Sequence, residues 1–160
     1  HCTKIGNLIR SCISKYIELA DDALLYQRFA KTMTKIKDLD IENEKGKRLV
    51  KNGLKTKEGR IILQQFEFGD ISNFNQNTQI FLGLWDKSLH LDKAIFADEV
   101  AIVSIKIDFE NYLTESFEEK IKLQESQNEV IFENHFSEED DVIHFVAVKR
   151  DSHVVQMGFV

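Results

Sequence analysis

The 160-residue chain contains no proline and only two cysteines, Cys2 and Cys12. Proline makes up about 5% of average sequences, and its absence here fits an A+T-rich genome without indicating a function. Both cysteines fall in one predicted helix, where ten residues at about 1.5 Å each separate them by roughly 15 Å. That distance excludes a disulfide within the helix. We interpret both as small apolar helix residues rather than as a metal or redox site.

Several motifs that carry chemistry are also missing. The sequence has no Gly-x-x-x-x-Gly-Lys-Ser/Thr loop, no dinucleotide fingerprint and no Gly-x-Ser-x-Gly elbow, which argues against nucleotide binding and serine hydrolysis. No apolar run approaches the roughly 20 residues of a membrane helix. Residues 1–10 lack the apolar segment and cleavage site of a signal peptide. Because the chain begins at His1 instead of methionine, we expect it to be processed, trimmed or incomplete.

The chain has 42% hydrophobic and 30% charged residues, which indicates one folded domain over residues 1–160. Its charge is unevenly distributed along the sequence. Residues 1–60 hold 14 Lys+Arg and 8 Asp+Glu, a net of +6, whereas residues 61–160 hold 7 and 19, a net of −12. Residues 108–141 alone hold 12 acidic and 2 basic residues. This asymmetry indicates either attraction to an oppositely charged partner or two solvated faces that keep the protein soluble.

Two longer helices are predicted first, because apolar residues recur every three to four positions. One covers residues 3–20 and the other about 22–38, with Asp21 and Asp22 as the N-cap of the second.

Two short helices are expected next, near residues 43–52 and 56–65. Gly53 is predicted to be the C′ glycine that ends the first of them. Thr56 is predicted to be the N-cap of the second.

From Phe66 onward the apolar period changes to two, which is typical of strands. About six strands are predicted, over residues 78–85, 99–109, 116–124, 128–134, 142–149 and 153–160. In residues 99–109 one face is apolar throughout and the other becomes polar toward the end. The class is therefore α+β: a helical part over residues 1–65, followed by an antiparallel sheet or sandwich over residues 66–160.

The stretch from residue 42 to residue 60 holds seven positive and three negative charges. A nucleic-acid patch is disfavoured, because no aromatic residue lies between Phe29 and Phe66 for base stacking and the second half is acidic. Solvated helix faces and a protein interface remain as interpretations. The candidate interface residues here are Lys45, Lys47, Arg48, Lys51, Lys55, Lys57 and Arg60. We expect these cations to face the acidic residues 108–141, in the same molecule or the next.

The last strand stops in mid-pattern at the end of the sequence, which indicates truncation or an edge that pairs with another chain. Val155, Met157 and Phe159 complete the candidate interface.

Histidines and carboxylates give only weak indications of a metal site. His135 and His144 flank the acidic turn 137–141, and Glu133 or Asp141 could join them. That turn lacks the alternating pattern of a calcium loop. We therefore predict no metal, no cofactor and no catalytic residue. Trp85, the single tryptophan, is interpreted as a core anchor.

Three stretches resemble the recurrent pattern of an uncharacterised family of Bacteroidota proteins: GNLIR (6–10), RFAKTMTKIKDLD (28–40) and GKRLVKNGLKTKEGRIILQQFEF (46–68). FADEVAIVSIKIDFE (96–110) matches more loosely. The resemblance implies a helical region followed by a β-rich region, with further segments beyond both ends of this chain. It supplies no activity and no catalytic residue. Its matched positions are glycines, apolar helix residues and Arg/Lys, which favours a structural or assembly protein.

The favoured hypothesis is a non-enzymatic structural subunit that self-associates into a filament, a virion-like shell or another homopolymer. Its expected partners are copies of itself, with no nucleic acid, membrane span or small-molecule substrate. The compartment stays open, with an extracellular or cell-surface assembly preferred to a cytoplasmic one. The alternatives are a module that binds protein or glycan through its sheet, and a small enzyme with a site assembled across the sheet.

Overall fold

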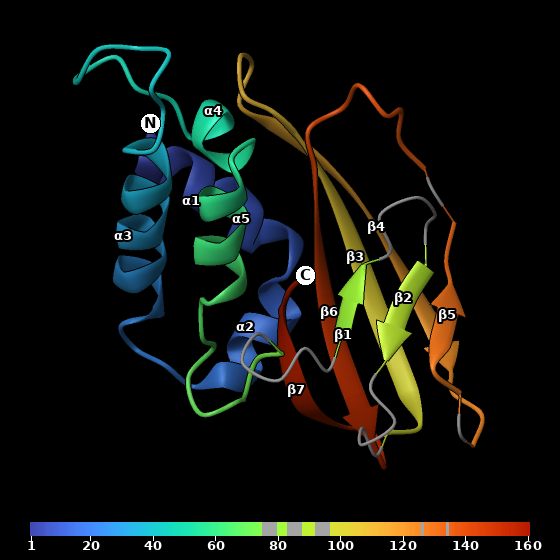
Figure 1. Ribbon diagram of the computed structural model, residues 1–160. Helices are drawn as coiled ribbons and strands as arrows, with labels where there is room; N and C mark the ends of the chain where they lie inside the picture. The colour runs from blue at the N-terminus through green and yellow to red at the C-terminus, as the bar shows by residue number, and fades with distance from the viewer. Residues whose placement is uncertain (75–79, 83–87, 92–96, 126, 134) are drawn as a thin grey trace.

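The computed structural model describes residues 1–74, 80–82, 88–91, 97–125, 127–133 and 135–160. Its elements form three layers (Figure 1): the helices, a four-stranded antiparallel sheet in the middle, and a three-stranded antiparallel sheet on the far side. The predicted α+β class, with helices first and antiparallel strands after them, is confirmed.

Five helices make up the first layer: α1 (Cys2–Cys12), α2 (Ser14–Ala20), α3 (Leu25–Lys37), α4 (Val50–Leu54) and α5 (Lys57–Gln64). None of these described helices combines the length and the apolarity that a membrane crossing requires. The predicted helix over residues 3–20 is interrupted at Ile13, whose φ of −124° and ψ of 24° are not helical. No proline or glycine marks that break, so the apolar period runs through it unchanged.

The predicted starts of two helices are wrong. The N-cap of α3 is Leu24, not an aspartate, although the Asp22 carboxylate accepts a hydrogen bond from the Leu24 N–H at 3.0 Å. The predicted helix over 43–52 begins only at Val50. Thr56 is confirmed as the N-cap of α5, because its hydroxyl oxygen accepts from the Gly59 N–H at 2.9 Å.

The middle sheet contains β3 (Glu99–Asp108), β4 (Leu113–Lys122), β6 (Val142–Arg150) and β7 (His153–Phe159), in the order β4-β3-β6-β7. The small sheet contains β1 (Ile80–Leu82), β2 (Ser88–Leu91) and β5 (Glu129–Ile131), in the order β1-β2-β5. The predicted strands all have a counterpart, and β2 is an additional strand that the alternation did not reveal.

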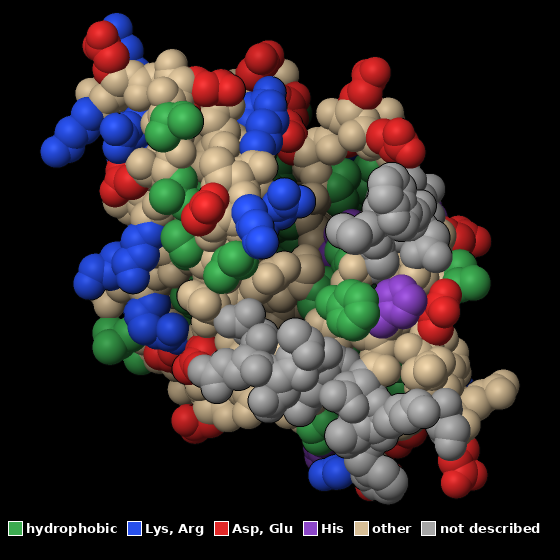
Figure 2. All heavy atoms as spheres, viewed as in Figure 1, with side chains coloured by type: hydrophobic (Ala, Val, Ile, Leu, Met, Phe, Trp, Pro, Cys, Tyr) green, Lys and Arg blue, Asp and Glu red, His purple; other side chains and the backbone are tan. Residues whose placement is uncertain are grey.

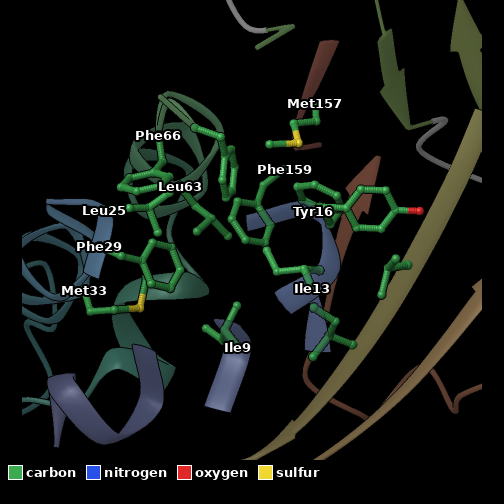
Figure 3. Close-up of a cluster of buried hydrophobic side chains, with 14 of the residues drawn as sticks. Ile9, Ile13, Tyr16, Leu25, Phe29, Met33, Leu63, Phe66, Met157 and Phe159 are labelled. Atoms are coloured by element: carbon green, nitrogen blue, oxygen red, sulfur yellow. The ribbon is translucent and has the colours of Figure 1, made fainter. Parts of the chain in front are cut away.

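Two apolar cores lie on opposite faces of the middle sheet. The first, between the helices and the sheet, gathers Tyr16, Phe29, Phe66 and Phe159 among others, and Figure 3 shows these side chains converging. The second lies between the two sheets and includes Val100, Ile102, Leu89 and Val146. The prediction that one face of 99–109 becomes polar toward its end is confirmed, because Val100 and Ile102 are buried under the small sheet, whereas Lys106 and Asp108 are only half-buried.

Candidate functional site

The loop between α3 and α4, which carries part of the predicted basic surface, is held by Asp40. This carboxylate is 1% exposed and accepts hydrogen bonds from the N–H groups of Glu42 and Leu49, both at 2.9 Å. The side-chain amides of Asn43 and Asn52 donate to it at 2.8 and 3.2 Å. Burial opposes ionisation, but the four hydrogen bonds outweigh it and lower the pKa of Asp40 to about 2. Nothing in the spacing of the residues around Asp40 indicates this role.

Two glycines let α3, α4 and α5 approach closely. A Cβ at Gly53 would lie 1.8 Å from the Ile36 carbonyl oxygen, and one at Gly59 would lie 2.0 Å from the Gly53 carbonyl oxygen. Gly53 is therefore inside α4 as a packing glycine, and its predicted role as a C′ residue is wrong. Each glycine is needed because a neighbouring backbone occupies the space of a side chain.

The predicted basic residues lie along the loop and helices that follow α3. Five of the seven are exposed: Lys45, Lys47, Lys55, Lys57 and Arg60. The remaining two, Arg48 and Lys51, are half-buried, and each has a partner. The Arg48 guanidinium donates to the Asp38 carbonyl oxygen at 3.1 Å, and the Lys51 ammonium lies 3.8 Å from the Asp141 carboxylate. One of the seven cations thus faces the acidic region 108–141 within the same molecule.

The two halves of the sequence, which differ in net charge, lie largely in different layers of the fold. Residues 1–60, with their net of +6, lie in the helical layer, and residues 61–160, with their net of −12, supply α5 in part and both sheets. Figure 2 shows most of the visible Lys and Arg side chains over the helical side of this view, with acidic side chains among them, and further acidic side chains at the rim of the sheet side. The helical layer and the sheets thus differ in net charge.

A groove also runs between α3 and α5 on the helical layer. It has a volume of about 490 Å³ and is lined on one side by Arg28, Lys31 and Lys35. Arg28 is engaged there, since its guanidinium pairs with Asp22 and donates to the Glu67 carbonyl oxygen at 3.0 Å. Lys31 and Lys35 are exposed and add to the positive face.

The last strand, β7, was interpreted as truncated or as an edge that pairs with another chain, and the protein's own chain contacts this edge at Gln156 and Met157. The Met157 N–H donates to the Ser72 carbonyl oxygen at 3.0 Å, and Ser72 forms a parallel bridge with Gln156. The side chains of Met157 and Phe159 are buried in the first core, and Val155 is half-buried against the second. Met157 and Phe159, which were predicted as candidate interface residues, are therefore core residues of this chain.

The opposite edge of the middle sheet is β4. In the described part of the chain, β4 pairs only with β3, and its ten residues form the end of the sheet. Leu113 is 62% exposed on this strand. On the face toward the small sheet, the Phe117 ring stacks on His135, with centroids 4.2 Å apart. A strand with an unpaired edge can accept a further strand.

A polar cluster joins α2 to β4. The Glu118 carboxylate accepts from the Tyr16 hydroxyl at 3.0 Å and lies 2.6 Å from the Lys15 ammonium. Burial, reinforced by the nearby Glu118 carboxylate, raises the pKa of Tyr16 above its usual value. Tyr16 is thus a protonated hydrogen-bond donor that fixes Glu118 on the helical side of the strand.

The histidines considered for a metal site have separate environments. His144 is buried and its Nδ1 lies 3.0 Å from the Ser104 hydroxyl, whereas His135 stacks on Phe117 with Glu133 3.8 Å away. Among the described residues, no group of three His, Cys, Asp or Glu side chains is placed to hold a metal ion. In the acidic turn, Asp140 accepts from the Ser137 N–H at 2.9 Å, and its carboxylate lies 3.7 Å from Lys106.

The outer face of the small sheet carries an aromatic pair that sequence reasoning missed. Phe81 is 52% exposed, and its ring stacks on His90 with centroids 5.0 Å apart and planes 16° apart. Ile131 on the same sheet is 78% exposed. In Figure 2 a histidine lies beside a hydrophobic side chain on the sheet side of the molecule. Trp85, which was predicted as a core anchor, lies outside the described residues.

Comparisons with protein-family models, with curated proteins and with solved structures give no match for this chain. The resemblance to the Bacteroidota family therefore stays a prediction from the motifs in residues 6–68.

Proposed function

We propose that the protein is a non-enzymatic structural subunit that self-associates into a homopolymer, such as a filament or a virion-like shell. The observation that carries the proposal is the separation of charge between layers: a basic helical layer and acidic sheet layers. A contact between the basic face of one copy and the acidic face of the next leaves both opposite faces free. Such head-to-tail contacts repeat and produce open polymers or rings.

The exposed cations Lys45, Lys47, Lys55, Lys57 and Arg60 are proposed to form the basic side of that contact. On the acidic side, Glu125 before β5 and Glu129 in β5 of the small sheet are both exposed. Complementary charges of this kind speed association and fix its orientation more than they add affinity. The contact is therefore expected to depend strongly on salt.

Sedimentation velocity over a range of protein concentrations tests the proposal. In about 0.01 M salt the Debye length is about 30 Å, and in about 1 M salt it is about 3 Å. We expect fast-sedimenting assemblies at low salt that shrink as salt is added. A monomer at every concentration and at both salt levels would contradict the proposal.

A matched pair of variants locates the contact. Lys45→Glu/Lys47→Glu reverses two exposed charges in the candidate interface, and Lys31→Glu/Lys35→Glu makes the same change in net charge on α3. We expect the first variant to lose assembly at low salt and the second to keep most of it. Equal loss in both would mean that net charge, and not a defined surface, controls association.

The alternative is a binding module that recognises protein or glycan through a sheet. The exposed Phe81–His90 pair favours it, because flat ring faces can stack on the apolar face of a sugar ring. A glycan array with the wild type and Phe81→Ala tests this function. Loss of a signal in Phe81→Ala, but not in a Leu113→Ala control on the other sheet, would support the alternative.

A further inference from the structure

We propose that β4 pairs antiparallel with β4 of a second copy, across a two-fold axis perpendicular to the middle sheet, with Glu119 opposite Glu119 of that copy. The pairing extends the sheet to the order β7-β6-β3-β4-β4-β3-β6-β7. It goes beyond the proposed head-to-tail assembly, because this dimer rests on backbone pairing and does not require the charged faces.

The backbone groups available for this pairing follow from the ladder between β3 and β4. The Leu123 N–H donates to the Asp98 carbonyl oxygen at 2.8 Å, one step beyond the pair Glu99–Lys122. Hydrogen-bonded pairs alternate in an antiparallel ladder, so the odd-numbered residues of β4 bond to β3. The outward N–H and C=O groups belong to the even-numbered residues: Thr114, Ser116, Glu118, Lys120 and Lys122.

The two faces of β4 restrict the register. Glu118 and Lys120 oppose Val103 and Ala101 of the first core, so they face the helical layer, whereas Phe117 and Ile121 face the small sheet. A two-fold axis perpendicular to the sheet keeps each face on its own side. Residues opposite each other must therefore both be odd-numbered or both be even-numbered.

Among the registers that obey this rule, the one centred on Glu119 is complementary on both faces. It places Glu118 opposite Lys120 on the helical side and Phe117 opposite Ile121 on the other, each pair occurring twice by symmetry. Opposite charges and apolar pairs across strands are stabilising, and like charges are not. A register centred on Glu118 places that residue opposite itself, and one centred on Phe117 places Glu115 opposite Glu119 twice.

The chosen register also fits the positions of the backbone groups and the existing contacts of the side chains. The pairs Glu118–Lys120 and Ser116–Lys122 are formed by outward-facing residues, and together they give about eight hydrogen bonds between the copies. The one like-charge pair is Glu119 with itself. Its cost is reduced because the Glu119 carboxylate already accepts from the Glu133 N–H of its own chain at 3.0 Å.

Charged residues on an edge strand commonly prevent pairing with another chain. A cross-linking experiment decides whether the charges of β4 prevent pairing or select its register. In a Cys2→Ser/Cys12→Ser background, Glu119→Cys places two thiols across the axis, where opposite Cβ atoms are about 4.5–5.5 Å apart. Glu115→Cys lies on the same face, but its copies are offset by eight residues, or about 27 Å. Both variants are oxidised in about 1 M NaCl, where charge contacts are screened.

We expect a disulfide-linked dimer from Glu119→Cys and none from Glu115→Cys at the same concentration. No dimer from Glu119→Cys, or equal cross-linking of both variants, would overturn the proposed pairing. If the salt-sensitive assembly persists in that case, the head-to-tail proposal stands while this one fails.

Proline variants test the backbone bonds directly. The Lys120 N–H points outward, so Lys120→Pro removes no bond to β3 but removes one at the centre of the pairing. Thr114→Pro also removes an outward N–H from the edge of β4, but Thr114 lies outside the residues that pair between the two copies. We expect Lys120→Pro to weaken dimerisation in sedimentation equilibrium by about tenfold or more and Thr114→Pro to leave it unchanged. Circular dichroism confirms that each variant folds, and equal dimerisation of the two folded variants would refute the pairing.

Discussion

Asp40 holds the loop on which part of the basic surface is built. Its carboxylate binds two backbone N–H groups and two side-chain amides from residues 42–52, which otherwise have little regular structure before α4. The ionised Asp40 carboxylate thus stabilises, through these hydrogen bonds, the conformation of the segment that contains Lys45 and Lys47. The sequence indicated the charges of this segment, but the partners of Asp40 could not be read from spacing.

Asp40→Asn is expected to lower the urea midpoint of unfolding. The asparagine amide has an NH₂ donor in place of one carboxylate oxygen, and this donor would face the N–H groups that now donate to Asp40. The pKa of Asp40 is lowered from 3.8 to about 2 by folding, so its ionised form stabilises the native state above the unfolded pKa. That stability is lost as the pH falls toward the folded pKa. The difference in unfolding free energy between wild type and variant should therefore shrink as the pH is lowered from about 5 to about 2.

Asp38→Asn is the control for this series, because Asp38 is exposed and two residues away. It should change the midpoint little at any of these pH values. A difference between wild type and Asp40→Asn that stays constant down to the lowest pH would show that the ionised carboxylate is not what stabilises the loop.

At the scale of elements, two helix glycines differ in what surrounds them. Gly53 in α4 leaves room for the carbonyl oxygen of Ile36 in α3. Gly6 in α1 has only side-chain neighbours, and a Cβ there would lie 3.5 Å from Phe29 and 3.6 Å from Met33. The first glycine is required by packing, and the second merely permits extra backbone freedom.

The two glycines predict opposite effects of the same substitution. Gly53→Ala should destabilise by about 1–3 kcal/mol, because the new methyl group forces α3 and α4 apart. Gly6→Ala should stabilise by about 0.5–1 kcal/mol, since alanine is favoured within a helix and the contacts are of ordinary length. Urea denaturation of both variants measures the difference. Stabilisation by Gly53→Ala would contradict the close packing of α4 on α3.

Sequence reasoning succeeded at this scale where a signal is local and failed where it depends on distant residues. The Thr56 cap and the strand 99–109 were predicted, because a capping hydroxyl and an alternating apolar pattern are properties of adjacent residues. The packing role of Gly53 depends on Ile36 of another helix, and no proline or glycine marks the break at Ile13. The candidate interface was divided in the same way: exposed lysines remain at the surface, but Met157 and Phe159 are in the core.

At the scale of the whole molecule, β3 and β6 join the two cores. Ala101 and Phe145 face the helices, whereas Ile102 and Val146 on the same strands face the small sheet. The stabilities of the helical layer and the small sheet can therefore be coupled without direct contact between them. Each depends on the same two central strands, so loss of one core removes the support of the other.

This shared support predicts one unfolding transition. Ile102 is 1% exposed in the core between the sheets, and Ile102→Ala should cost about 2–5 kcal/mol through lost burial and the cavity left behind. Because β3 also supports the helices, the helical circular dichroism signal should be lost at a lower urea concentration, together with the near-ultraviolet signal of the aromatic residues. Phe81→Ala, on the exposed outer face of the small sheet, is the control and should leave the midpoint almost unchanged. If Ile102→Ala instead produced two separate transitions, with the helical signal retained at its wild-type midpoint, the two cores would be independent and β3 would not couple them.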